Sequence, residues 1–322
     1  MTGEARIVAL GGGHGLYATL TALRGLTPDL TAIVTVADDG GSSGRLRSEL
    51  GIVPPGDLRM ALSALCADND WGRTWRDVLQ FRFSTDGPLD GHALGNLLIA
   101  ALWGRNGDVV DGLAWVARLL QAHGRVLPLS DDPLEVSAVV HSAAGSRTVV
   151  GQAAVASADG EIDELRLSPE RPHVPRETVE AIDDADMVVL GPGSWYTSVL
   201  THFMVQPVAE ALVRAADRSV LVLNVGHDDE ETAGTSRADD VRALQRMAPT
   251  FAPRTVLVDS EHCDEPGLAD AVSRWSARLV AAPLRAGGGA AAHDTDALRR
   301  ALSTVATDLA LPVRAPERGV AG

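Results

Sequence analysis

The stretch Ile7–Leu16 (IVALGGGHGL) decides the fold, because a short apolar run passes directly into a glycine-rich turn. Leucines then recur at helical spacing, at Leu16, Leu20 and Leu23. A second apolar run, Leu30–Val36, is rich in β-branched residues. Both runs are apolar throughout, which is typical of parallel strands covered on two faces. The sequence therefore predicts a β-α-β unit at the start of a mostly parallel sheet.

The rest of the chain continues this alternation with one interruption. Apolar residues three and four apart predict helices around Met60–Ala67, Thr74–Phe83, Leu94–Trp103 and Val109–Gln121. Two Val-rich runs predict antiparallel strands within a small β excursion near 125–167, namely Leu134–His141 and Arg147–Ala156. Further strands are predicted at Met187–Leu190, Val220–Val225 and Thr255–Val258.

These patterns predict an α/β, Rossmann-like fold with helices on both faces of the sheet. We expect one domain over 1–311, with a helical and β-hairpin insert at about 57–167. The residues from 312 to 322 have no periodicity and are expected to form a flexible tail, and the Ala-Gly-rich stretch 286–292 is expected to form a loop.

The composition excludes several classes of function. The 322-residue chain carries a formal net charge of -15, which disfavours general binding of nucleic acid. No apolar run reaches the roughly 18 residues of a membrane span. The start of the chain lacks the pattern of a signal peptide. Cys66 and Cys263 are far apart and form no C-x-x-C pair, so we expect a cytoplasmic protein.

The chain contains no lysine, and all 28 of its basic residues are arginines. Chemistry that needs an amine, such as a Schiff base or a phosphate-loop lysine, is therefore excluded. Any fixed positive charge in a site must come from arginine, whose planar fork suits phosphate oxygens.

Two loops at the ends of the first two strands carry the strongest ligand signal. The glycines at 11, 12, 13 and 15 allow a phosphate to approach the backbone and the following helix start. A second run, Val36–Arg47 (VADDGGSSGRLR), follows the next strand at the same sheet edge. Its paired carboxylates can hold Mg²⁺ or accept ribose donors, and its arginines can bind phosphate. The alternatives are a tight structural turn and a solvated acidic turn.

Three further motifs contribute candidate residues. PPGDLR places Asp57 at a helix start, either as a plain cap or as a catalytic or metal-binding residue, with Arg59 beside it. GHALGN enters an apolar helix, where Asn96 is predicted to point into a cleft and His92 is more typical of a packed residue. GPGSWYTS repeats the strand, glycine loop and helix start, but it lacks the G-x-S-x-G pattern of a nucleophile.

Taken together, these motifs resemble those of the YvcK-type gluconeogenesis factors, within the YvcK/CofD-like superfamily. GGGHGL, the long run TAIVTVADDGGSSGRLRSELGIVPPGDLR, LQFRF, GHALGNLLIAAL, GRVLP and VLGPGSWYTS match in order and spacing from about Ile7 to Gly234. The resemblance implies a fold related to the 2-phospho-L-lactate transferases. It implies a regulatory role in growth on gluconeogenic carbon sources, cell-wall synthesis and cell shape, and binding of UDP-sugars such as UDP-N-acetylglucosamine.

By motif position, the resemblance implies nucleotide-sugar contacts from Gly12, Gly13, Asp38, Asp39, Gly193, Ser194 and Asn224. In the transferase branch, metal binding is expected at the positions of Asp38, Asp39 and Asp57. Two positions depart from the pattern: His14 replaces a threonine, and the centre of the motif after Asn224 has become acidic at 228–231. Extra carboxylates there would repel a diphosphate.

The leading hypothesis is a UDP-sugar-binding regulator without turnover. We expect it to form a homo-oligomer, with Mg²⁺ as an optional cofactor. The alternative is a 2-phospho-L-lactate transferase-type enzyme; a Rossmann dehydrogenase is disfavoured because G-x-G-x-x-G is absent. No catalytic residue is assigned. The predicted ligand-binding residues are Gly11, Gly12, Gly13, Gly15, Asp38, Asp39, Gly40, Gly41, Ser42, Ser43, Arg45, Asp57, Arg59, Asn96, Gly191, Gly193, Ser194, Tyr196, Thr197 and Asn224.

Overall fold

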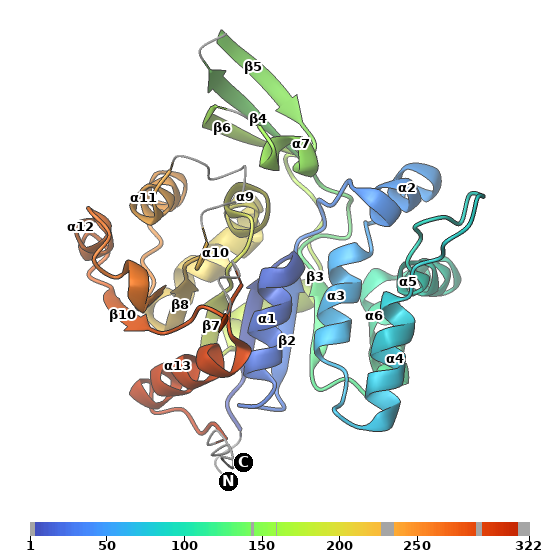
Figure 1. Cartoon of the computed structure of the whole chain (residues 1–322), viewed down its shortest axis with the longest axis horizontal. Coiled ribbons are helices and arrows are strands. Elements are labelled where there is room, and N and C mark those ends of the chain that lie inside the picture. The colour runs from blue at the N-terminus through green and yellow to red at the C-terminus, as the bar shows by residue number, and fades with distance from the viewer. Residues whose placement is uncertain (1–3, 143–144, 159, 227–234, 288–291, 315–322) are drawn as a thin grey trace.

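The main sheet of the protein is seven-stranded and parallel throughout (Figure 1). The computed structural model describes residues 4–142, 145–158, 160–226, 235–287 and 292–314. The strands of this sheet are β1 (Ile7–Gly11), β2 (Leu30–Val34), β3 (Arg125–Pro128), β7 (Met187–Leu190), β8 (Ser219–Val222), β9 (Thr255–Asp259) and β10 (Arg278–Ala282). Their order is β10-β9-β8-β7-β1-β2-β3.

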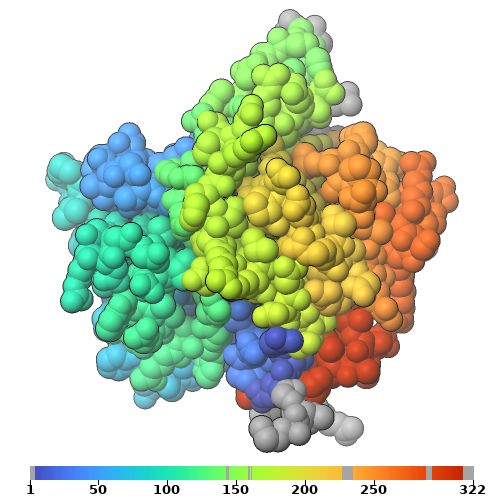
Figure 2. Space-filling view, turned by 180° about the vertical axis from the view of Figure 1, so that it is seen from behind, coloured from blue at the N-terminus to red at the C-terminus, as the bar shows by residue number. Residues whose placement is uncertain are grey.

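Helices cover both faces of this sheet. The connection from β1 to β2 and the connections from β7 through β9 run in opposite directions along the sheet, so right-handed crossovers place their helices on opposite faces. One face carries α1 (Gly13–Leu23), α2 (Gly41–Leu50), α3 (Gly56–Ala64), α4 (Asp70–Gln80), α5 (Leu94–Asn106), α6 (Val109–Leu120) and α13 (Thr295–Asp308). The other carries α8 (Arg176–Asp184), α9 (Thr201–Met204), α10 (Gln206–Arg214), α11 (Arg237–Met247) and α12 (Leu268–Ser273). Figure 2 shows this second face.

The strands of the sheet centre are buried along their whole length, as their continuous apolar runs predict. One hydrophobic core joins both faces of the sheet and extends from Ala5 to the last helix. The predicted α/β, Rossmann-like fold is confirmed, because seven parallel strands form one sheet with helices on both faces. No helix in the described ranges is long and apolar enough to cross a membrane.

A separate antiparallel sheet stands above the carboxyl ends of the main strands (Figure 1). It consists of β4 (Glu135–Ser142), β5 (Gly145–Val150) and β6 (Glu161–Ser168), in the order β5-β4-β6. A short helix, α7 (Gln152–Ala156), lies between β5 and β6 in the chain. A small core of its own holds this sheet and α7 together, and we call these elements the small module.

Two boundaries in this region differ from the sequence prediction. The predicted strand Arg147–Ala156 is wrong beyond residue 150, because Gly151 has a positive φ of 101° that ends the strand and α7 follows. The helix-forming composition of Gln152–Ala156 is the signal that the Val-rich pattern concealed. In addition, β3 belongs to the main sheet as its edge strand, so the antiparallel excursion begins at β4.

The described residues also include three short helical segments and the start of the predicted tail, residues 312–314. A π-helix, η1 (Trp195–Val199), follows β7, and two 3₁₀ turns are η2 (Ala216–Arg218) and η4 (Ser260–His262). Of the predicted tail, residues 312–314 contact the body, where the Arg314 N–H donates to the Leu26 carbonyl oxygen at 2.8 Å. The acidic segment 228–231 and most of the predicted loop 286–292 lie outside the described residues.

Candidate functional site

A cavity of about 530 Å³ opens at the carboxyl ends of β1, β2, β7 and β8. This edge is the place where the direction of the crossovers reverses, and ligands of doubly wound folds bind there. The described residues that line it follow β1, β2, β7, β8 and β10 in the chain or belong to α3 and the small module: Gly12, Gly13, His14, Gly15, Ala18, Asp38, Asp39, Asp57, Gln152, Ala153, Ala156, Pro192, Gly193, Ser194, Thr197, Ser198, Asn224, Val225, Gly226, Ala292 and His293.

The two glycine loops meet face to face in this cavity. A Cβ atom at Gly15 would overlap the Pro192 carbonyl oxygen, so only glycine allows the first loop to approach the loop after β7. A Cβ atom at Gly12 would lie 2.6 Å from a carboxylate oxygen of Asp57 and 2.6 Å from the Thr35 hydroxyl. Glycine at both positions therefore lets the loop at the start of α1 pack closely against Pro192, Asp57 and Thr35 at the cavity.

Asn224, at the end of β8, fixes the loop after β7. Its Oδ1 atom accepts the Gly193 N–H at 2.8 Å, and its Nδ2 atom donates to the Gly193 carbonyl oxygen at 2.8 Å. Beside this loop the hydroxyls of Ser194 and Thr197 are hydrogen bonded to each other. The amide of Asn224 thus holds the second glycine loop in place from a neighbouring strand.

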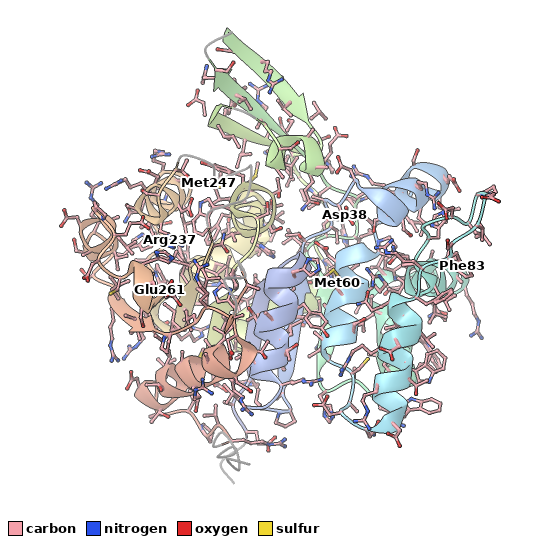
Figure 3. All side chains as sticks on the ribbon, in the orientation of Figure 1. Asp38, Met60, Phe83, Arg237, Met247 and Glu261 are labelled. Carbon is pink, nitrogen blue, oxygen red and sulfur yellow. The ribbon has the colours of Figure 1, made fainter. Side chains whose placement is uncertain are left out.

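Two carboxyl groups, Asp38 and Asp57, lie together at the floor of the cavity. Figure 3 labels Asp38 between the small module and α3. Burial, followed by the nearby charge of Asp38, raises the pKa of Asp57 to about 7. The Gly13 N–H, the Thr35 hydroxyl and the Arg59 charge act in the opposite direction. Asp38 also accepts the Gly40 N–H at 3.0 Å, which shapes its loop.

Asp39 points away from this pair and toward the small module. Its Oδ1 atom accepts the Ala153 N–H at 3.1 Å, in the first turn of α7. Gly151 precedes α7 and offers no capping side chain, and a Cβ atom there would collide with the Asp39 carboxylate. Asp39 therefore supplies from another segment the acceptor that a helix start needs.

Half of the sequence-predicted ligand-binding residues line the cavity. These are Gly12, Gly13, Gly15, Asp38, Asp39, Asp57, Gly193, Ser194, Thr197 and Asn224. The other predicted residues lie outside the cavity lining: Gly11, Gly40, Gly41, Ser42, Ser43, Arg45, Arg59, Asn96, Gly191 and Tyr196. Ligand contact stays a prediction for both groups. In the second group, Ser42, Arg45, Arg59 and Asn96 have hydrogen-bond partners within the protein.

A buried polar network contains three residues of the second group, Ser42, Arg59 and Asn96. The Ser42 hydroxyl accepts the Ala93 N–H at 3.2 Å and the Asn96 Nδ2 at 3.0 Å, so its own proton goes to His92 Nδ1, 3.0 Å away. Asn96 in turn accepts from Arg59 Nε at 2.9 Å. Burial lowers the pKa of His92, in agreement with its acceptor role. The network joins the start of α2 to α5.

The arginines of these motifs face away from the cavity. Arg59 is buried, and its guanidinium donates to Asn96 and Gln80. Desolvation in this position lowers its pKa to about 10. Arg45 donates to the Asp90 carbonyl oxygen at 2.7 Å. The described lining of the cavity therefore contains no arginine.

Sequence reasoning missed several residues of the lining. Gln152, Ala153 and Ala156 come from α7, and small apolar residues carry no motif that would have revealed them. His293, which follows the Ala-Gly-rich stretch, donates from Nε2 to the Leu223 carbonyl oxygen at 3.3 Å, and burial lowers its pKa to about 4. Pro192 and Ser198 lie within the quoted GPGSWYTS motif and His14 lies within GGGHGL, so these three omissions were predictable.

The donor set of the cavity fits a hard divalent cation. Asp38 and Asp57 offer carboxylate oxygens beside the Thr35 hydroxyl, and Mg²⁺ binds through one or two carboxylates together with phosphate oxygens. Burial and, after it, the negative charge of Asp38 raise the pKa of Asp57, and a cation bound by both carboxylates would favour their charged forms. Asp38, Asp39 and Asp57 do not converge on one point as a three-ligand cluster among the described residues.

Such a three-residue cluster exists elsewhere, at Asp259, Glu261 and His262. Its charge is already compensated by Arg285, whose Nη2 atom lies 3.2 Å from His262 Nε2 and whose Nε atom lies 3.4 Å from Glu261. The Leu284 and Arg285 N–H groups donate to Asp259 at 2.7 and 2.8 Å. This arrangement is a structural ion-pair network that closes the loop after β10.

Comparison with known proteins shows the family of this chain. Residues 7–296 match the family model described as 2-phospho-L-lactate transferase CofD. A Mycobacterium tuberculosis (strain H37Rv) protein with a provisional name as a gluconeogenesis factor is 49% identical over 259 residues, or 79% of this chain and 76% of that protein. The gluconeogenesis factor of Bacillus subtilis (strain 168) is 39% identical over 260 residues, covering 80% of each chain.

A solved structure extends the similarity to nearly the whole chain. The crystal structure of a UPF0052-family protein from Bacillus halodurans superposes with a TM-score of 0.84 at 31% identity, covering 94% of this chain and 100% of that one. The fold and the site thus define a CofD-like α/β protein. The chain belongs to the CofD family and, within this YvcK/CofD-like superfamily, groups with the gluconeogenesis factors.

Proposed function

We propose that this protein binds a nucleotide sugar of the UDP-N-acetylglucosamine class in the cavity and acts as a regulator that does not consume it. Its role would be in cell-wall synthesis and cell shape during growth on gluconeogenic carbon sources. The observation that carries the proposal is the meeting of two glycine-rich loops, Gly12–Gly15 and Gly193–Ser194, at the reversal point of a doubly wound sheet.

The charge of the cavity implies how a diphosphate would be held. Backbone N–H groups at the start of α1 can bind its oxygens. No arginine is available among the described lining residues, and three carboxylates face the same space. Mg²⁺ bound by Asp38 and Asp57 would supply the missing positive charge. We therefore expect nucleotide-sugar binding to depend on Mg²⁺.

The alternative function is a 2-phospho-L-lactate transferase-type enzyme. The match to the CofD family model over residues 7–296 favours it, and the Asp38–Asp57 pair would hold the metal of such an enzyme. Regulator and enzyme differ in whether the bound ligand is turned over, because the same loops serve both.

Calorimetry and mass spectrometry together test the proposal. UDP-N-acetylglucosamine with Mg²⁺ should bind, and at about a hundredfold excess over Kd it should stabilise the fold by about 2.7 kcal/mol. Mass spectrometry after prolonged incubation should recover the ligand unchanged. Binding of a guanine nucleotide in place of UDP-sugars, or conversion of the ligand, would contradict the proposal and favour the transferase.

A further inference from the structure

The small module supplies one whole wall of the cavity. Three residues of α7 line it, Gln152, Ala153 and Ala156, and the main body supplies all the other described lining residues. In Figure 1 α7 lies on the underside of the small sheet, facing the ends of the main strands. The cavity is therefore bounded by the main body and by the small module, which has a small hydrophobic cluster of its own and also joins the main core through Val136 and Leu167.

One side of α7 packs in the small core, and another side faces the cavity. Val155 is fully buried in the small core with Ala138 and Val140. Gln152 and Ala156 are four residues apart, so they share the side that faces the cavity, and Ala153 lies next to Gln152 on this side. Ala154 is exposed and absent from the cavity lining. The helix thus presents one amide and two methyl groups to a ligand.

Two contacts hold this wall against the main body. Asp39 accepts the Ala153 N–H at 3.1 Å, and Gln152 Nε2 lies 3.5 Å from the Thr197 hydroxyl. The first contact comes from the loop after β2, and the second comes from the helix after β7. α7 therefore spans the cavity between the acidic loop and the second glycine loop.

The position of the acidic loop indicates which part of a ligand meets this wall. In doubly wound folds the acidic residue after the second strand is the usual partner of the ribose hydroxyls. Because Asp39 caps α7, a ribose bound at this loop brings the attached base against Gln152, Ala153 and Ala156. A carboxamide can donate to and accept from the edge of a base, and the methyl groups leave room for its ring.

We propose that α7 is the specificity-determining wall for the nucleoside half of the ligand, with Ala153 and Ala156 setting the available space and Gln152 contacting the base. This inference rests on the proposed nucleotide-sugar function. It assigns the small module a direct part in recognition, separate from the glycine loops that face the phosphates.

Three alanine-to-leucine changes in α7 test the inference with a built-in control. Ala153→Leu and Ala156→Leu place a branched side chain in the cavity, and each should weaken UDP-N-acetylglucosamine and UDP in parallel by about tenfold or more in calorimetry. Ala154→Leu makes the same change on the exposed side of the same helix and should leave both affinities within about threefold of wild type.

A fourth variant adds no bulk and keeps the test decisive if a leucine variant fails to fold. Gln152→Ala removes the amide, so the affinity ratio of UDP to GDP should fall at least about threefold. Thermal unfolding without ligand checks that each variant is folded.

The other possible results separate a failure of the inference from a failure of the proposed function. If the leucine variants weaken UDP-N-acetylglucosamine but leave UDP unchanged, the wall contacts the sugar and the nucleoside assignment is overturned. Equal affinities for the leucine variants at 153, 154 and 156 overturn the inference alone. A wild-type protein that binds no UDP-sugar overturns the proposed function, and the inference with it.

Discussion

The two glycine loops and the run Gly40–Arg47 look alike in sequence, yet the structure uses them differently. The loops after β1 and β7 face the cavity and each other. The run after Asp39 enters α2, whose buried hydroxyl Ser42 belongs to a polar network with α5. The comparison shows that glycine and serine in a row indicate close backbone packing. Whether a ligand or another helix approaches that backbone depends on the direction of the following helix.

Gly15→Val tests the contact between the two glycine loops and has the largest expected effect. A side chain at this position overlaps the Pro192 carbonyl oxygen, so one loop must move, at a cost of about 3 kcal/mol in the free energy of unfolding. Ligand binding should be lost. Chemical denaturation and calorimetry measure both effects.

Gly104→Val is the matched control for this change. A Cβ atom at Gly104 meets nothing within 4 Å, because this glycine lies on an open side of α5. Its substitution should change the free energy of unfolding by no more than about 0.5 kcal/mol. Equal effects at the two positions would show that the loops do not need their close approach.

Asn224→Ala tests whether the second glycine loop must be fixed in order to bind ligand. The change leaves the Gly193 N–H and carbonyl groups without their partner, and ligand affinity should fall by about tenfold or more. Asn224→Asp keeps an acceptor for the Gly193 N–H but removes the donor to the Gly193 carbonyl oxygen. Comparing the ligand affinities of Asn224→Asp and Asn224→Ala therefore separates the contributions of the two hydrogen bonds. An Asn224→Ala variant that binds like wild type would mean that Gly193 lies outside the ligand contact.

Asp57 and Arg59 extend the comparison. Both belong to the PPGDLR motif, but Asp57 lines the cavity and Arg59 lies in the buried polar network. The folded-state pKa of Asp57 is about 7 and its ordinary value is 3.8, so the folded protein binds this proton more tightly than the unfolded chain does. The stability that Asp57 contributes is present below about pH 4 and is lost as the pH rises to about 7. The loss should be on the order of 2 kcal/mol.

The measurement is urea unfolding of wild type and Asp57→Asn between pH 4 and pH 8. The difference between the two proteins isolates Asp57 from His202 and His293, whose pKa values are lowered to about 4 and which destabilise the fold in acid. Parallel pH profiles for the two proteins would show that Asp57 is freely solvated.

Ser42→Ala tests the polar network without touching the cavity. Loss of the hydroxyl leaves Asn96 and the Ala93 N–H short of an acceptor, so the fold should lose about 1 kcal/mol. Affinity for UDP-N-acetylglucosamine should change by less than about threefold. A large loss of affinity with little loss of stability would return Ser42 to the group of ligand contacts.

Arg45→Ala has the smallest expected effect. Its guanidinium donates to the Asp90 carbonyl oxygen and lies outside the described cavity lining, so ligand affinity should stay within about twofold of wild type. Calorimetry at low salt, where any long-range attraction is greatest, is the strictest measurement. A loss of tenfold or more would show that Arg45 swings toward the phosphates when ligand binds.

The sequence predicted the elements of this site better than its contacts. Strand, glycine loop and helix start follow from local chemistry, so the loops at Gly12 and Gly193 were found in advance. The contribution of α7 was hidden, because Ala153 and Ala156 have no signature of their own and a valine-rich pattern favoured a strand. The sequence also grouped Asp38, Asp39 and Asp57 as one set of acidic residues. In the structure Asp39 caps α7, and only Asp38 and Asp57 lie together.

The sequence by itself determined the doubly wound sheet, the glycine loops at its edge and the absence of lysine from any site. These features depend on runs of neighbouring residues, whose periodicity and backbone freedom are local properties. Only the tertiary structure decided which polar side chains share the cavity. Arg59 and Asn96 pair with each other in the interior because burial demands a partner for each, and the small module reaches the cavity because a carboxylate far away in sequence caps its helix.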